Sequence, residues 1–153
     1  ADRLKAFAQK YGVQVYLEPG EAIAQNAASL EVTVLDVMQR GKNLAVVDSS
    51  TEAHMLDLLI YRLSARIEPN QGAHRYMVCG KTCLAGDVFG EFDFSQPLQV
   101  GQRLSIQDAA GYTMVKKNWF NGVAMPAIAV KEKDGSERLL RQFGYEDFVS
   151  SLG

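Results

Sequence analysis

The stretch from Cys79 to Asp87, CGKTCLAGD, holds the most reactive side chains of the chain. Cys83 is a candidate acid, because a thiol is mostly protonated at neutral pH and can still give its proton up. The alternatives are a small buried hydrophobic residue and a redox or metal pair with Cys79. Further metal ligands are missing, since both histidines are isolated in sequence. Asp87 is either a substrate ligand or the start of an Asx turn after a glycine.

A second candidate stretch, Leu17-Glu18-Pro19-Gly20, lies far upstream. Glu18 follows residues 13–17, an apolar run that suits a buried parallel strand. In α/β barrels the chemistry lies at the C-terminal ends of such strands. Gly20 would let the backbone approach a phosphate closely, because it has no Cβ. The alternative is a Glu-Pro-Gly turn at the surface.

These stretches are followed by Gly111-Tyr112 and Phe120-Asn121-Gly122. In this order they resemble the C-terminal part of the pyridoxal-phosphate decarboxylases that join an alanine-racemase-like (β/α)8 barrel to a β-domain. That superfamily includes ornithine, arginine and diaminopimelate decarboxylases. The resemblance is strongest to its branch acting on carboxynorspermidine and carboxyspermidine in polyamine biosynthesis. It implies pyridoxal 5′-phosphate as the cofactor and a homodimer with shared active sites.

The resemblance also implies roles for individual residues. Glu18 would face the pyridine nitrogen of the cofactor and keep it protonated, so that the ring can accept the electrons released with carbon dioxide. Gly20 and Tyr112 would hold the cofactor phosphate. Cys83 would reach into the partner subunit's site and protonate the α-carbon. The Phe120-Asn121-Gly122 segment would support the site, and the alternative for Tyr112 is a core aromatic with a satisfied hydroxyl.

The chain also departs from its relatives in ways that concern the substrate. Leu84 follows Cys83 where ornithine and diaminopimelate decarboxylases have an acidic residue. Glu21 and Asp57 stand where relatives carry arginines. Such exchanges would favour an elongated, positively charged polyamine substrate, through charge-assisted hydrogen bonds to Glu21 and Asp57. Asp87 would lie near the substrate end of its loop. The alternatives are a solvated strand edge for Glu21 and a charge at a helix end for Asp57.

The sequence pattern predicts a mainly β fold, an antiparallel Greek-key-like barrel or sandwich. Residues 3–11 have helical periodicity, with Asp2 as a possible cap and Gly12 as the stop. A helical turn capped by Ser50 or Thr51 is expected at 51–56, and a closing helix at 145–149. Expected strands cover residues 30–34, 44–48 after a hairpin at 40–43, 75–79, one or two stretches of 97–107, and 127–133 with 137–142 around a type I′ turn at Asp134-Gly135.

Size and composition fit one well-packed domain of 153 residues with a net charge of −2. This charge gives no general attraction to nucleic acid or membranes. No apolar run approaches the roughly 20 residues of a membrane span, and no secretion signal is recognisable. Two cysteines make no disulfide framework, so a reducing cytoplasm is expected.

We therefore expect half an enzyme: residues 1–20 as the last helix and strand of a missing N-terminal barrel, and residues 21–153 as the C-terminal β-domain. Lys5 lies on a predicted helix, so the lysine that forms the Schiff base would be absent and this part alone inactive. Two other readings stay open. One is a diaminopimelate or other basic amino-acid decarboxylase. The other is a non-catalytic β-domain that binds a polyamine or a protein partner.

Overall fold

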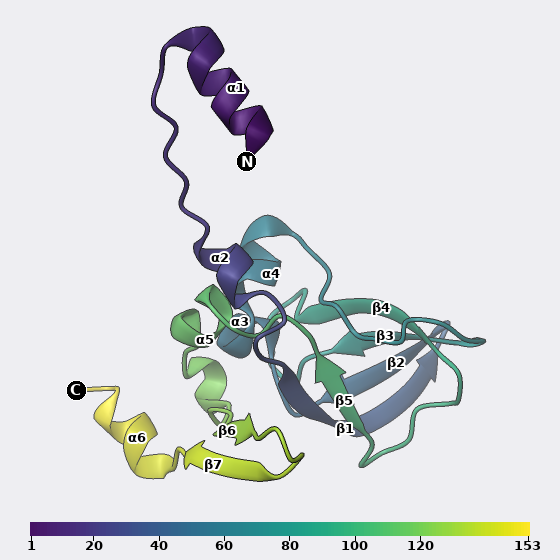
Figure 1. Ribbon diagram of the computed structural model, residues 1–153. Helices are drawn as coiled ribbons and strands as arrows, with labels where there is room; N and C mark the ends of the chain where they lie inside the picture. Colours follow the sequence, from purple (N-terminus) through teal and green to yellow (C-terminus); the bar gives the residue numbers. More distant parts are fainter.

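The computed structural model describes all residues from 1 to 153, and its largest element is a five-stranded mixed sheet in the order β4-β3-β2-β1-β5 (Figure 1). Neighbouring strands are antiparallel except β2 and β3, which are parallel. The strands are β1 Leu30–Arg40, β2 Lys42–Val47, β3 His74–Cys79, β4 Val88–Phe94 and β5 Arg103–Ile106. The strands predicted for this sheet are confirmed, including the hairpin through Gly41, whereas β4 was not predicted.

The sheet curls into a half-barrel whose two outer strands are joined through the connector at residues 65–67. Ile67 forms an antiparallel bridge with Ile106 of β5. On the other side of the connector, the amide of Ala65 donates to the carbonyl of Phe89 in β4 at 2.7 Å. The mainly β fold is thus confirmed, in the form of one curled sheet with a connector across its open side.

The core lies inside the curl of this sheet. On β1, buried Val32 and Val34 alternate with exposed or half-exposed residues, as the period of two predicts. The largest fully buried side chain is Phe89, which has no exposed surface. Truncating such a side chain to alanine costs about 3–5 kcal/mol of unfolding free energy. The hydrophobic interior of the half-barrel therefore fixes the loops that leave its strands.

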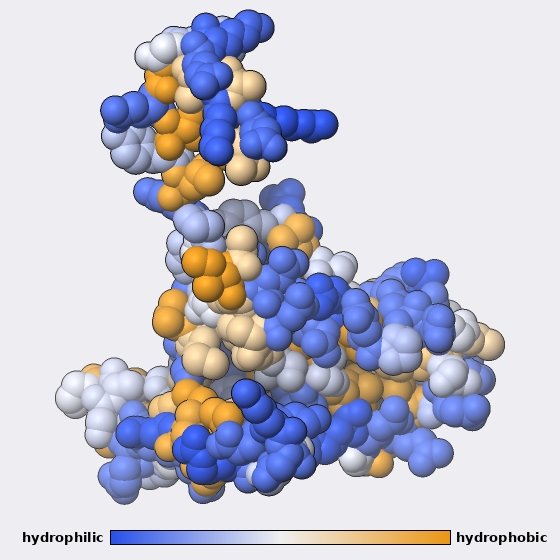
Figure 2. Space-filling model, in the orientation of Figure 1, coloured by the Kyte–Doolittle hydropathy of each residue, from blue (hydrophilic) through white to orange (hydrophobic).

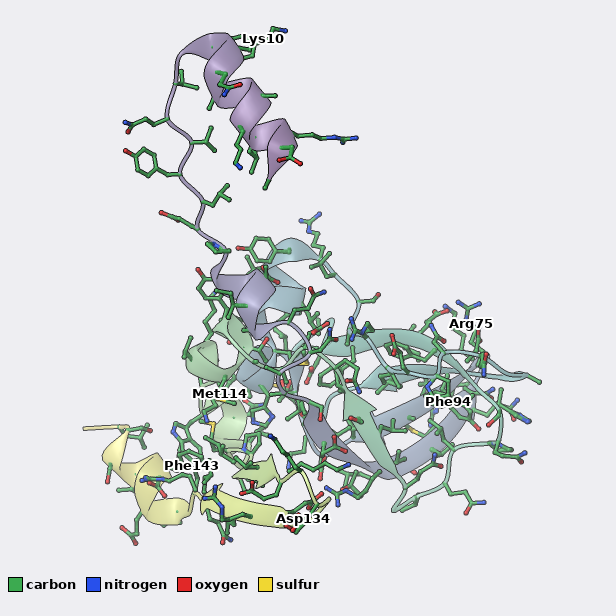
Figure 3. The ribbon with its side chains drawn as sticks, in the orientation of Figure 1. Lys10, Arg75, Phe94, Met114, Asp134 and Phe143 are labelled. Atoms are coloured by element: carbon green, nitrogen blue, oxygen red, sulfur yellow. The ribbon has the colours of Figure 1, made fainter.

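A two-stranded hairpin, β6 Ile128–Lys131 and β7 Glu137–Arg141, follows the half-barrel, as predicted. The type I′ turn was wrong, because only Gly135 has a positive φ (86°) and Asp134 does not. The amide of Gly135 donates to the carbonyl of Glu132 at 3.0 Å. This is a tight turn ending in a left-handed glycine, with Asp134 at the tip (Figure 3).

The chain also has short helices and one 3-10 turn at Phe120–Gly122. The helices are α1 Asp2–Tyr11, α2 Gly20–Ala24, α3 Thr51–His54, α4 Leu56–Tyr61, α5 Tyr112–Lys116 and α6 Tyr145–Ser150. Helix α1 ends as predicted at the left-handed Gly12 (φ 62°). The cap expected at Asp2 was wrong: Ala1 is the N-cap, and Asp2 lies in the first turn. Ser50 caps α3 as expected, since its Oγ accepts from the amide of Ala53 at 3.4 Å.

Helix α1 and the extended segment after it stand away from the sheet (Figure 1), and no residue of α1 is buried. The strand expected at residues 13–17 is contradicted. A strand needs a neighbour for its backbone hydrogen bonds, and no strand of this chain lies beside the segment. Figure 2 shows apolar residues on α1, the extended segment and α2. Exposed examples are Phe7, Tyr16, Leu17 and Ile23.

None of the helices combines the length and the hydrophobicity that a bilayer crossing requires.

Candidate active site

A cavity of about 470 Å³ lies beside the half-barrel, between α2, α4, the connector and the start of α5. It brings together three predicted site residues from distant parts of the chain: Glu21 on α2, Asp57 on α4 and Tyr112 on α5. Arg66 and Asp108 also line it, and they form an ion pair in which Nη1 of Arg66 lies 2.9 Å from Oδ2 of Asp108. The cavity therefore combines acidic, basic and aromatic groups.

Helices α2 and α5 form one wall of the cavity. A Cβ built on Gly111 would lie 3.6 Å from the Cβ of Ala24, so the two helices approach closely there. Gly111 has a φ of 60° and starts α5, which places Tyr112 at the cavity with 59% of its surface exposed. Glu21 forms no ion pair, and the Tyr112 hydroxyl makes no hydrogen bond within the chain. Both groups are free to contact a ligand.

Asp57 is already paired within the chain. Lys116 Nζ lies 2.6 Å from Asp57 Oδ1 and 4.7 Å from the centre of the Tyr112 ring. The hydrogen bond to Asp57 raises the pKa of Lys116 above its ordinary value. Sequence reasoning missed the Asp57–Lys116 pair, whose members are 59 residues apart. The contact of Lys116 with Tyr112 did have a signal in the sequence, because the i+4 spacing places both side chains on one helix face.

Cys83 lies on the loop between β3 and β4, with its side chain exposed. Its Sγ accepts a hydrogen bond from Asn121 Nδ2 at 3.3 Å. Cys79, at the end of β3, is partly buried, and burial together with the charge of Asp87 raises the pKa of its thiol. Both cysteines are free thiols. Of the two, only Cys83 is exposed to a reaction partner.

Asp87 is buried at the end of the same loop, with 5% of its surface exposed. Its Oδ1 accepts hydrogen bonds from the amide and the hydroxyl of Thr51, at 2.7 and 2.8 Å. Its Oδ2 accepts from the amide and the hydroxyl of Thr82, at 3.2 and 2.5 Å. Burial opposes ionisation, but these hydrogen bonds outweigh it and hold the pKa of Asp87 below its ordinary value. The carboxylate thus supports the loop, and neither oxygen is free for a ligand.

The sequence family whose description is "Pyridoxal-dependent decarboxylase, C-terminal sheet domain" matches residues 11–110. The chain belongs to the pyridoxal-dependent decarboxylase family.

Within this decarboxylase family, two curated relatives and one solved structure are especially similar. The carboxynorspermidine/carboxyspermidine decarboxylase of Herminiimonas arsenicoxydans is 68% identical over 99% of this chain and 41% of its own length. The carboxyaminopropylagmatine decarboxylase of Synechocystis is 44% identical over 92% of this chain and 38% of its own length. The carboxynorspermidine decarboxylase of Campylobacter jejuni, solved with norspermidine, is 36% identical with a TM-score of 0.80, covering 96% of this chain and 44% of that one.

The chain thus spans about two-fifths of the length of the curated decarboxylases that it matches. Several of its own groups suit pyridoxal phosphate. The free hydroxyl of Tyr112 is a donor for a phosphate, and Glu18 is exposed without an ion pair on the segment before α2. Glu18 and Cys83 do not line the cavity. Lys5 lies on α1, which stands apart from the sheet (Figure 1), and no residue of α1 lines the cavity.

Proposed function

We propose that the chain is the C-terminal part of a pyridoxal-phosphate-dependent decarboxylase that acts on carboxynorspermidine and carboxyspermidine. The observation that carries this proposal is the cavity in which Glu21, Asp57 and Tyr112 meet. An aromatic ring and two carboxylates are groups that bind alkylammonium ions. The match to the Herminiimonas decarboxylase, 68% identical, covers 99% of this chain. A polyamine product is therefore the expected outcome.

We propose that residues 1–20 belong to an N-terminal barrel and residues 21–153 to the β-domain. The exposed apolar side chains of α1 and the extended segment support this division, because a barrel would cover them. The exposed position of Cys83 supports a homodimer, in which one subunit's thiol would reach the site of the other. A reducing cytoplasm would keep Cys79 and Cys83 as the free thiols that the structure contains.

When bound, pyridoxal phosphate supplies a ring that accepts the electron pair released as the substrate loses carbon dioxide. Tyr112 and Gly20 would hold its phosphate, and Glu18 would face its ring nitrogen. Cys83 would then donate its Sγ proton to the α-carbon of the product. To reach the partner subunit's site, this thiol must be accessible at the surface of its own domain. Cys83 is exposed there.

Substrate choice would rest on Glu21 and Asp57. The Glu21 carboxylate could bind a substrate ammonium group directly. Asp57 would first have to release Lys116, with which it forms an ion pair. Asp87 supports the Cys83 loop instead of binding substrate, because Thr51 and Thr82 occupy both of its carboxylate oxygens. Leu84 lies next to Cys83 and offers no charge to the distal group of diaminopimelate or ornithine. This set favours an elongated polycation.

The test uses the full-length protein that contains this chain. The parent should decarboxylate carboxynorspermidine and carboxyspermidine, with kcat/KM well above that for diaminopimelate or ornithine. The variant Cys83→Ala should lose most of its kcat, while Cys79→Ala, a matched control four residues earlier, should keep it. Equal turnover of Cys83→Ala and the parent would remove the acid role. A preference for diaminopimelate would replace the proposed substrate.

A further inference from the structure

We propose that Asn121 is a positioning residue for the Cys83 thiol, and that α3 holds both groups in register. This inference rests on the proposed role of Cys83 as the acid. Its starting point is the 3.3 Å hydrogen bond from Asn121 Nδ2 to Cys83 Sγ, which joins two loops 38 residues apart in sequence. It is the one hydrogen bond in the chain that the Cys83 sulfur makes.

The backbone at Asn121 is specialised for this contact. Its φ and ψ are 56° and 16°, in the left-handed region, where asparagine is among the few tolerated side chains. This conformation interrupts the short 3-10 turn Phe120–Gly122. Asn118 closes the turn, since its Oδ1 accepts from the amide of Phe120 at 2.8 Å. This turn therefore holds the side-chain amide of Asn121 beside the Cys83 sulfur.

That turn is anchored to α3. Asn118 Nδ2 donates to the carbonyl of Glu52 at 2.9 Å, and the Asn118 amide donates to the carbonyl of Ala53 at 2.8 Å. These bonds satisfy carbonyls at the C-terminal side of a helix that is only four residues long. The turn that carries Asn121 is thus held by hydrogen bonds to Glu52 and Ala53 of α3.

The loop that carries Cys83 is anchored to the opposite end of α3. Asp87 Oδ1 accepts from the amide and hydroxyl of Thr51, the first residue of the helix. Asp87 Oδ2 holds Thr82, the neighbour of Cys83. Thr51 and Ala53 have no exposed surface. A largely buried helix therefore contacts both the loop of Cys83 and the turn of Asn121, and so positions the Cys83 sulfur and the Asn121 side-chain amide relative to each other.

The hydrogen bond from Asn121 restricts rotation of the Cys83 side chain. Because the sulfur accepts this bond, its own S–H bond points away from Asn121. A thiol that must deliver a proton to one carbon gains rate from such orientation. Deleting the donor while keeping the backbone would leave substrate binding intact and slow the chemical step. A slower chemical step with unchanged substrate binding distinguishes a positioning role from a structural role, in which both would be lost.

The experiment compares two variants of the full-length decarboxylase. Asn121→Gly keeps the left-handed backbone and deletes the donor, and Asn121→Asp keeps the shape and replaces the donor with a carboxylate. Both should lower kcat by about ten- to a hundredfold, with KM for carboxynorspermidine within about twofold of the parent. In a Cys83→Ala background, Asn121→Gly should cause no further loss, because its effect passes through the sulfur.

Alkylation of each thiol by iodoacetamide, followed peptide by peptide by mass spectrometry, gives the second readout. In Asn121→Asp the carboxylate beside the sulfur disfavours the reactive thiolate, so Cys83 should react at least about threefold more slowly. Cys79 should react at the parent's rate. An unchanged kcat in both Asn121 variants, or a loss that persists in the Cys83→Ala background, would overturn the proposal. A fully active Cys83→Ala would instead refute the acid role on which it rests.

Discussion

A Cβ on Gly80 would lie 2.2 Å from Oδ2 of Asp87, so the carboxylate occupies the space that any larger residue would need. The two residues are also joined through the backbone, because the amide of Gly80 donates to the carbonyl of Asp87 at 2.8 Å. They are the two ends of the Cys83 loop. The loop is thus closed by a direct contact between glycine and carboxylate, and its geometry depends on both.

Substituting Gly80 should destabilise the full-length protein. In Gly80→Ala the new methyl group collides with the buried Asp87 carboxylate, and such overpacking costs about 1–3 kcal/mol of unfolding free energy. Gly144→Ala is the matched control, because nothing lies within 4 Å of its built Cβ and its φ is −122°. Thermal unfolding measures both variants. An equal melting temperature for Gly80→Ala and Gly144→Ala would contradict the contact.

The charge of Asp87 should also stabilise the fold. The hydrogen bonds from Thr51 and Thr82 keep its pKa below the ordinary value, so its contribution is present at neutral pH and is lost as the pH falls through that lowered pKa. Asp87→Asn removes the charge and should cost roughly 1.5–3 kcal/mol at pH 7.

Urea unfolding at neutral pH and at about pH 4 and below gives the measurement. The difference between the parent and Asp87→Asn should shrink toward the acid end, because the parent's carboxyl becomes protonated there. A difference that stays constant over this range would show that the Asp87 charge does not stabilise the loop.

Much of the half-barrel could be predicted from local patterns. The alternation of Val32 and Val34 with polar residues in β1 shows which face is buried, and the hairpins follow from their turn residues. Strand β4 escaped prediction although Glu91 and Asp93 alternate with Phe92 and Phe94. Gly90, with a φ of 145°, interrupts the pattern, and buried Phe89 lies out of phase with buried Phe92. This segment is a strand because β3 pairs with it along its length.

Two errors, the Asp2 cap and the type I′ turn, were local. The others concerned a partner that the local sequence does not contain. The run at residues 13–17 has strand composition but no neighbouring strand in this chain. Asp87 could be a ligand or a turn residue, and Thr51, 36 residues away, decides between them. The contact between Asp57 and Lys116 was likewise not predicted, because the two residues are 59 positions apart in sequence and only the fold brings them together. Glu21 and Tyr112 were singled out by their types and order, and the fold brings both to one cavity, where their roles stay predictions.

A buried histidine should make the fold sensitive to mild acid. Burial, reinforced by the nearby charge of Lys81, lowers the pKa of His54 from 6.5 to about 4. The unfolded chain therefore binds a proton between these two values while the folded chain does not. Stability should be full above pH 6.5 and fall as the pH drops toward 4, by about 3 kcal/mol in total.

The variant His54→Gln should remove this slope from the unfolding free energy between pH 6.5 and pH 4. His74→Gln, which leaves His54 in place, should keep the slope of the parent. Urea titrations at intervals of about half a pH unit resolve an effect of this size. If His54→Gln and the parent show the same pH dependence, His54 titrates normally in the folded protein.

The last prediction concerns Lys116, which contacts two residues that line the proposed substrate cavity, Asp57 and Tyr112. Lys116 holds Asp57 at 2.6 Å and lies over the ring of Tyr112, the surroundings that a substrate ammonium would seek. If Asp57 binds substrate, Lys116 competes for it. Lys116→Met should free the carboxylate and lower KM for carboxynorspermidine about three- to tenfold, as the gain of one exposed charge contact allows.

Two controls locate this effect. Lys117→Met removes the neighbouring lysine, whose ammonium lies over the Phe143 ring and not at Asp57, and should leave KM unchanged. In Asp57→Asn/Lys116→Met the gain should vanish, because no carboxylate is left to bind. The gain should also shrink in about 0.5 M salt, as screening weakens the ammonium–carboxylate attraction. A raised KM in Lys116→Met would mean that Lys116 itself binds the substrate, through a carboxylate, and that Asp57 serves to orient it.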